Sequence, residues 1–170
     1  MMKKTAGFTL VELMITLAVV VIVLAIGVPS FIQISRNNNL TVQANELVTA
    51  LNFARSEAVK RGVQVTIAPT GAEWETGWRI FTDEDNFGVL DAGETELKVH
   101  DAIKEGYTLR TGAHFNLYVA YLPTGTSRGN GGPNDTFRLC AENKDTAQAR
   151  QIVINLVGRI KMEQGTDTCP

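Results

Sequence analysis

The sequence predicts an α+β fold, in which one long N-terminal helix, half transmembrane and half amphipathic, packs on antiparallel β-sheet. Three observations predict it. An apolar run of helical length opens the chain, an amphipathic segment follows, and short β-like segments separated by turn residues occupy the remainder. The chain has 170 residues, enough for one membrane helix and one compact domain.

The apolar run covers residues 8–28 and carries one charge, Glu12. At about 1.5 Å per residue, a helix of this length spans roughly the ~30 Å hydrocarbon core of a bilayer. Lys3 and Lys4 precede the run and no lysine follows it closely, which predicts a cytoplasmic N-terminus. The alternative is an ordinary signal peptide, but the run exceeds the usual apolar region of about 7–15 residues and retains a charge.

Residues 31–61 are predicted to form an amphipathic helix that continues from the apolar run. Gly62 is the predicted stop, and Gly27 with Pro29 predicts an end or a bend between the two parts. Apolar residues recur at three- and four-residue spacing along one face, at Leu40, Ala44, Leu47, Leu51, Ala54 and Ala58. This face is expected to pack against the sheet.

After Gly62 the pattern changes to short β-like segments with turn signals between them. The predicted strands are 63–68, 78–82, 96–100, 107–110, 115–122, 137–140, 151–154 and 159–162. One domain of antiparallel sheet packed on the helix follows from this order.

The start of the apolar run reads Gly7-Phe8-Thr9-Leu10-Val11-Glu12-Leu13 and resembles the cleavage motif of type IV prepilins. In that family, prepilin peptidase cuts after the glycine and methylates the new N-terminal residue. The resemblance implies a cut between Gly7 and Phe8 and an N-methylated Phe8. It also implies four segments: a leader (1–7), a transmembrane helix (8–29), an amphipathic helix (30–62) and a periplasmic β-rich globular region (63–170).

Glu12 is expected to act in assembly. After cleavage its carboxylate would face the α-ammonium of Phe8, in the same chain or in a neighbouring subunit. In an apolar setting such a pair is stabilised, whereas either charge alone is penalised. The alternative is that the Glu12 side chain merely reaches the membrane interface.

Three further motifs follow in order: Phe53-Ala54-Arg55-Ser56-Glu57-Ala58, then Gly77-Trp78-Arg79-Ile80-Phe81-Thr82-Asp83, then Gly158-Arg159. Together they resemble the GspH/FimT family of minor pilins over nearly the whole chain. The resemblance implies a type IV pilin-like fold, and major and minor pilins or pseudopilins as partners. It implies residence in the inner membrane with a periplasmic C-terminal domain, followed by incorporation in a pilus or pseudopilus.

Three functions are open on this basis. The first is a minor pilin that initiates or caps a type IV pilus, serving motility, adhesion or DNA uptake, with a tip adhesin as a candidate partner. The second is a minor pseudopilin of the type II secretion system, and the third is a pilus-borne DNA-binding subunit for natural transformation. No nucleophile-elbow, zincin or phosphate-loop motif is present, so neither an enzyme nor a cofactor is predicted.

Cys140 and Cys169 are the two cysteines of the chain. They lie in the region expected outside the cytoplasm, where disulfides persist. A bond between them would close a loop of about 30 residues, worth roughly 3–4 kcal/mol in the chain-entropy model. A disulfide is predicted, with two free thiols as the alternative.

The segment 83–94 has acidic residues at its first, third, ninth and twelfth places: Asp83, Asp85, Asp91 and Glu94. A glycine holds the sixth place, which is close to EF-hand loop spacing. However, Phe87 replaces an oxygen ligand at the fifth place, and the flanks are predicted strands. The favoured interpretation is a hairpin loop with solvated carboxylates and no metal; a calcium site is the alternative.

The basic element Gly158-Arg159-Ile160-Lys161 lies near the C-terminus. DNA-binding members of the resembled family contact DNA with a Gly-Arg-x-Arg pattern, which makes Arg159 and Lys161 candidate DNA contacts. A lysine in the second place can still contact phosphate, but without the planar fork of arginine. Residues that would add to a basic patch, if folded nearby, are Arg128, Arg138 and Arg150. The alternative is a strand whose exposed side chains happen to be basic, in a chain of net charge -2.

Overall fold

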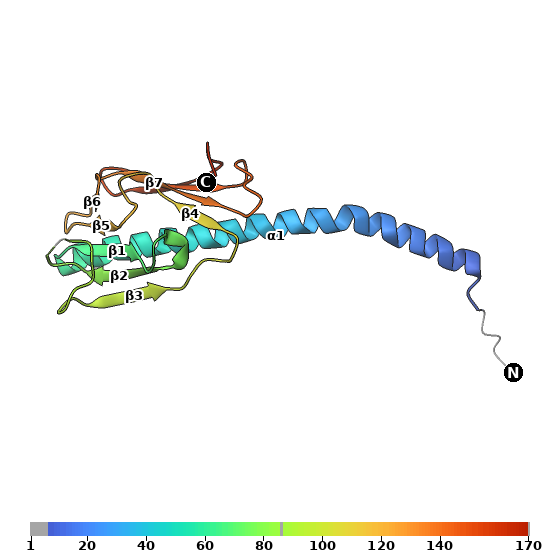
Figure 1. The fold of residues 1–170 in the computed structure, drawn as a ribbon, viewed down its shortest axis with the longest axis horizontal. Coiled ribbons are helices and arrows are strands. Elements are labelled where there is room, and N and C mark those ends of the chain that lie inside the picture. Colours follow the sequence, from blue (N-terminus) through green and yellow to red (C-terminus); the bar gives the residue numbers. More distant parts are fainter. Residues whose placement is uncertain (1–6, 86, 170) are drawn as a thin grey trace. The chain divides into compact units, whose positions relative to one another are not determined.

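The computed structural model describes residues 7–85 and 87–169 (Figure 1). Its single α-helix in this range, α1 (Leu10–Arg61), runs without a break through Gly27 and Pro29. Of the two predicted alternatives at these residues, an end or a bend of the helix, the end is therefore wrong. A proline removes one N–H from the helical ladder, and the turns on either side keep their own bonds. The chain divides into two compact units, Met1–Asn38 and Asn39–Pro170.

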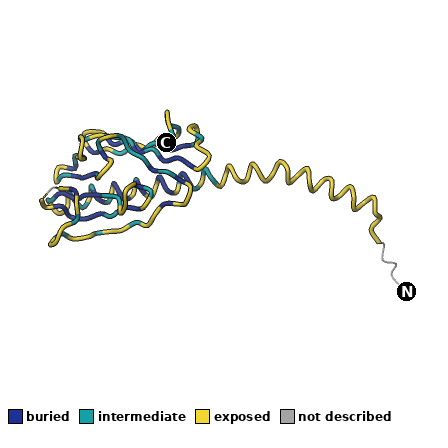
Figure 2. Tube along the Cα trace, viewed as in Figure 1, coloured by how far each residue is buried: buried dark blue, intermediate teal, exposed yellow. Residues whose placement is uncertain are grey.

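In the first unit, every described residue from 7 to 35 is exposed (Figure 2). The corresponding part of α1 is long and apolar enough to cross a membrane by length and composition. Leu24 and Ile26, for example, are 54% and 72% exposed. An apolar helix with no covering from its own chain requires another apolar environment.

The second unit begins where one face of α1 becomes buried. The buried positions of the helix are Leu40, Gln43, Ala44, Leu47, Ala50, Leu51, Ala54 and Ala58, which include the whole predicted apolar face. The helix ends as expected: Gly62 has φ +70° and donates its N–H to the carbonyl of Ala58 at 3.0 Å. This left-handed backbone conformation favours glycine, because a Cβ atom strains the backbone at positive φ.

Two antiparallel sheets complete this unit, with the strand orders β3-β2-β1-β5-β6 and β4-β7-β8-β9. The strands are β1 (Val65–Pro69), β2 (Trp78–Thr82), β3 (Glu96–His100), β4 (Thr108–Arg110), β5 (Val119–Tyr121), β6 (Ser127–Gly129), β7 (Asp135–Cys140), β8 (Arg150–Ile154) and β9 (Ile160–Gln164), with a 3₁₀ turn, η1 (Trp74–Thr76). Residues of α1 and of both sheets form one hydrophobic core, so the predicted α+β architecture is confirmed.

Aromatic side chains fill much of this core. Trp74 packs edge-on against Phe137 at 4.9 Å between ring centroids, and its indole N–H donates to the carbonyl of Phe115 at 2.9 Å. Trp78 stacks on His100 at 4.1 Å. Both tryptophans are 1% exposed, so they serve packing rather than a ligand site.

The predicted strand over 115–122 is wrong at its first half, where the structure has an irregular segment before β5. The carboxylate of Asp135 accepts the backbone N–H groups of Gly112, His114 and Phe115 at 2.9–3.1 Å. A side chain thereby takes donors that a strand would offer to its neighbour. The short strand β6 was not predicted, because its three residues in a glycine-rich stretch carry no alternating pattern.

The buried face of α1 should dominate the stability of the second unit. Leu51 is 0% exposed, and Leu51→Ala should cost about 2–5 kcal/mol and lower the melting temperature by roughly 4–20 °C. Tryptophan fluorescence of the detergent-solubilised chain would report this, because both tryptophans lie in the core. The matched control Leu156→Ala, at a side chain that is 61% exposed, should change little. Equal shifts in both variants would contradict this packing.

Candidate functional sites

The first described turn of α1 is closed by Thr9 and Glu12. The Glu12 carboxylate accepts the backbone N–H and the hydroxyl of Thr9, both at 3.2 Å. In return, the Thr9 hydroxyl accepts the N–H of Glu12 at 3.2 Å. This is a capping box, a pattern readable from the sequence as Thr-x-x-Glu.

The capping box directs the Glu12 carboxylate toward the N-terminal end of the helix. That end lies one residue from Phe8, the expected new N-terminus. An α-ammonium formed at Phe8 would therefore appear beside an existing negative charge. The Phe8 ring is 79% exposed and has the same unburied setting as the rest of the apolar segment.

The basic element begins in the tight turn between β8 and β9 with Gly158 and Arg159 and continues into β9 with Ile160 and Lys161. Gly158 donates to the carbonyl of Asn155 at 2.8 Å, while the Asn155 side chain accepts the N–H of Arg159 at 2.8 Å. Gly158 has φ +73°, and a Cβ there would stand 2.3 Å from the carbonyl oxygen of Gly125. Both constraints require glycine at this position.

Arg55 of α1 holds this turn against a second one. Its Nε donates to the carbonyl of Gly125 at 2.9 Å, and its terminal nitrogen donates to the carbonyl of Val157 at 3.0 Å. The Tyr121 ring lies next to Gly158, and burial raises the pKa of its phenol. Sequence reasoning identified Arg55 only as part of a family motif; the forked guanidinium explains why arginine suits a site with two carbonyls.

The predicted basic patch is only partly assembled. Arg159 and Lys161 are exposed, but Lys161 forms an ion pair with Glu163. Arg150 is 7% exposed and donates to the hydroxyl of Thr41 at 3.1 Å, so it faces the helix rather than solvent. Arg128 is exposed, but it lies in β6 of the other sheet.

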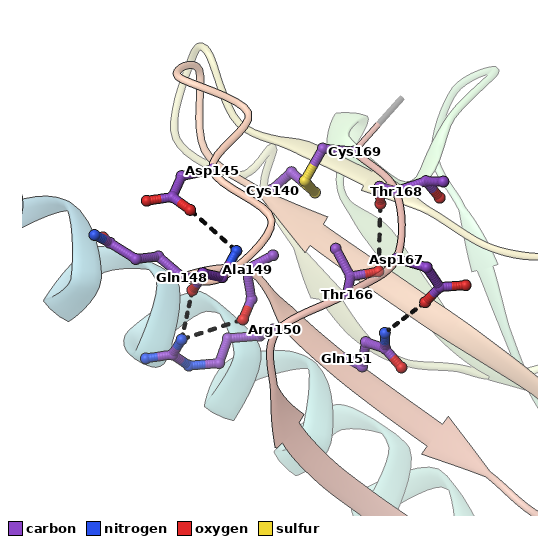
Figure 3. Close-up of a disulfide and its surroundings, with 11 residues drawn as sticks. Cys140, Asp145, Gln148, Ala149, Arg150, Gln151, Thr166, Asp167, Thr168 and Cys169 are labelled. Atoms are coloured by element: carbon purple, nitrogen blue, oxygen red, sulfur yellow. Dashed lines mark hydrogen bonds between the residues drawn. A yellow bond between two sulfur atoms is a disulfide. The ribbon is translucent and has the colours of Figure 1, made fainter.

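The predicted disulfide is present between Cys140, at the end of β7, and Cys169, in the tail after β9 (Figure 3). Their Cα atoms lie 5.8 Å apart, within the ordinary range for a disulfide. The tail is held further by Thr166, whose N–H donates to the carbonyl of Thr146, and by Asp167, which accepts from the amide of Gln151 at 3.2 Å. The bond thus fixes the segment that follows β9 onto the second sheet.

The acidic segment joins the paired strands β2 and β3, so the expected hairpin is present, but its carboxylates are not all solvated. Asp83 is 0% exposed, whereas Asp85 is exposed and Glu94 is half-buried. Carboxylate oxygens of these three residues lie within 4.8 Å of one another. Among the described residues, Asp91 is outside this group, so the structure brings together three of the four predicted ligands.

Comparison with known proteins identifies the family of this chain. The family model described as Type II transport protein GspH matches residues 43–158. The chain belongs to the GspH family. The model of the prokaryotic N-terminal methylation motif also matches, over residues 2–28. The motif and the exposed apolar helix fit a membrane-anchored pilin.

This GspH-family chain is similar in sequence to a fimbrial protein and to a type IV minor pilin, and it shares its fold with a minor pseudopilin. A fimbrial protein of Pseudomonas aeruginosa is 29% identical over 102 residues, which is 59% of this chain and 62% of the relative. The crystal structure of the type IV minor pilin FimU of Pseudomonas aeruginosa matches with a TM-score of 0.64 and 26% identity, over 80% of this chain and 98% of FimU. The minor pseudopilin EpsH of Vibrio cholerae shares the fold, with a TM-score of 0.56 at 11% identity over 74% of this chain and 97% of EpsH.

Removal of the disulfide should loosen the C-terminal tail. Cys140→Ser with Cys169→Ser should cost about 2–4 kcal/mol and lower the melting temperature by roughly 4–16 °C. Treatment of the unsubstituted chain with a thiol reductant should give a similar shift, and the same reductant should leave the double variant unchanged. A reductant effect on the double variant would show that the shift has another origin.

Proposed function

We propose that this chain is a minor pilin, a structural subunit that starts or caps the assembly of a type IV pilus. Prepilin peptidase cuts between Gly7 and Phe8 and methylates Phe8. Residues 8–29 then anchor the chain in the inner membrane, and the globular unit faces the periplasm until the subunit enters the filament.

The observation that carries this proposal is the uncovered apolar half of α1. Every described residue from 7 to 35 is exposed, although the same helix has a fully buried face farther along. Lipid satisfies such a surface before assembly. In a filament, helices of other subunits replace the lipid contacts, so one segment serves both states.

A pilus is favoured over a secretion pseudopilus by the degree of similarity to each kind of relative. FimU, a type IV minor pilin, is 26% identical and almost fully covered, whereas EpsH is 11% identical and supports the fold alone. The alternative function is that of a minor pseudopilin of the type II secretion system, which is consistent with the family description as a type II transport protein.

The charge of Glu12, rather than its capping bonds, should be what assembly requires. Glu12→Gln keeps an acceptor for the N–H of Thr9 but removes the charge that pairs with the Phe8 ammonium. Mass spectrometry should find this variant in the membrane, cleaved after Gly7 and methylated, but absent from sheared filaments. The control Glu57→Gln, at the far end of the same helix, should enter filaments. Normal entry of Glu12→Gln would reduce the role of Glu12 to helix capping.

Deletion of the gene in its own bacterium distinguishes a function in the type IV pilus from a function in the type II secretion system. We expect surface pili to disappear and to return on complementation, while secretion of type II substrates continues. Persistence of pili together with a block in secretion would support the pseudopilin function instead.

A further inference from the structure

We propose that the loop between β2 and β3 is a calcium site, with Asp83, Asp85 and Glu94 as its carboxylate ligands. The loop joins two paired strands, so the residue after β2 and the residue just before β3 come close together. One oxygen from each of the three side chains lies within 4.8 Å of the others. Calcium favours such clusters of carboxylate oxygens.

The surroundings of Asp83 support a bound cation independently of the proximity of the three carboxylates. Its side chain is 0% exposed, and its Oδ2 accepts bonds from the amide of Gln64, the hydroxyl of Thr66 and the N–H of Gly88 at 2.5–3.0 Å. The other oxygen, Oδ1, is buried and has no hydrogen-bond donor among the described residues. A buried carboxylate oxygen without a partner is costly, and a cation supplies the missing interaction.

The remaining ligands are positioned by the backbone of the loop. The two oxygens of Glu94 accept the N–H groups of Glu84 and Asp91, each at 2.9 Å. These bonds join the beginning and the end of the loop at the carboxylate in the twelfth place, where an EF-hand loop carries its bidentate ligand. The Asp85 carboxylate accepts the N–H of Phe87 at 3.2 Å, and this bond holds the Asp85 side chain against the loop.

The ligand chemistry selects calcium among common metal ions. The cluster offers hard oxygen donors and neither histidine nor cysteine, which disfavours zinc. Three carboxylates leave places that water and backbone carbonyls fill in the six- to eight-coordinate shell of calcium. Magnesium requires a smaller, strictly octahedral shell and keeps most of its water, so it should bind this loop more weakly.

Calcium at this position would fix an adjoining apolar surface. Phe87 and Val89 are 73% and 59% exposed and line a pocket together with Leu117 and Tyr118. Gly88, whose N–H binds the Asp83 carboxylate, lies against the Tyr118 ring: a Cβ there would be 2.3 Å from it. Ordering of the acidic ligands therefore orders the wall of this pocket.

The full-length chain in detergent provides the test, by thermal unfolding and by calorimetric titration with calcium. With a Kd in the range of extracellular calcium modules, about 10⁻⁴–10⁻³ M, about 10 mM calcium should raise the melting temperature by roughly 3–11 °C relative to chelator. The same concentration of magnesium should give a smaller rise. Equal melting temperatures in calcium and chelator, or equal rises with both ions, would overturn the proposal.

Two variants locate the site. Glu94→Gln removes the charge and keeps one of the two oxygens that accept the N–H groups of Glu84 and Asp91. Asp85→Asn removes the charge and keeps the side-chain shape. Both variants should fold but lose the calcium-dependent rise and the calorimetric heat. The control Glu105→Gln, at an exposed residue outside the loop, should keep both. Retention of calcium binding in Glu94→Gln and Asp85→Asn would place the cation elsewhere and refute this assignment. The filament experiments are independent of this result.

Discussion

The structure depends on one helix that must satisfy two different surroundings. The first part of α1 is apolar on all sides and exposed, while its later part buries a single face in the core of the globular unit. A helix that is hydrophobic all round needs lipid or other helices, whereas an amphipathic helix needs a sheet. The two halves of one element therefore define both the exposed apolar segment and one face of the folded unit.

The buried half of α1 also positions loops that are distant in sequence. Arg55 binds carbonyls in two separate turns, 70 and 102 residues farther along the chain. Gly158 allows those turns to approach each other, since any side chain would collide with Gly125. The C-terminal tail is secured separately by the Cys140–Cys169 bond. The two turns are thus fixed to α1 and to each other.

Hydrophobic periodicity and turn residues were enough to predict those elements that residues close in sequence determine. The bounds of β2 and β3, the stop at Gly62 and the buried face of α1 follow from periodicity and turn residues. The burial of Asp83 could not be predicted, because it results from Gln64 and Thr66, residues 19 and 17 positions earlier that reach it only through strand pairing. The strand predicted over residues 115–122 is shortened for the same reason. The Asp135 carboxylate, which is distant in sequence, accepts the backbone N–H of Phe115.

We propose that the exposed apolar half of α1 becomes buried among other subunits in the filament. A photo-activated cross-linking residue placed at Val21, which is 64% exposed, tests this most directly in cells that make pili. We expect cross-links between Val21 and the apolar helix of another pilin in sheared filaments. Recovery of the chain only in the membrane, with no cross-link to another pilin, would contradict it.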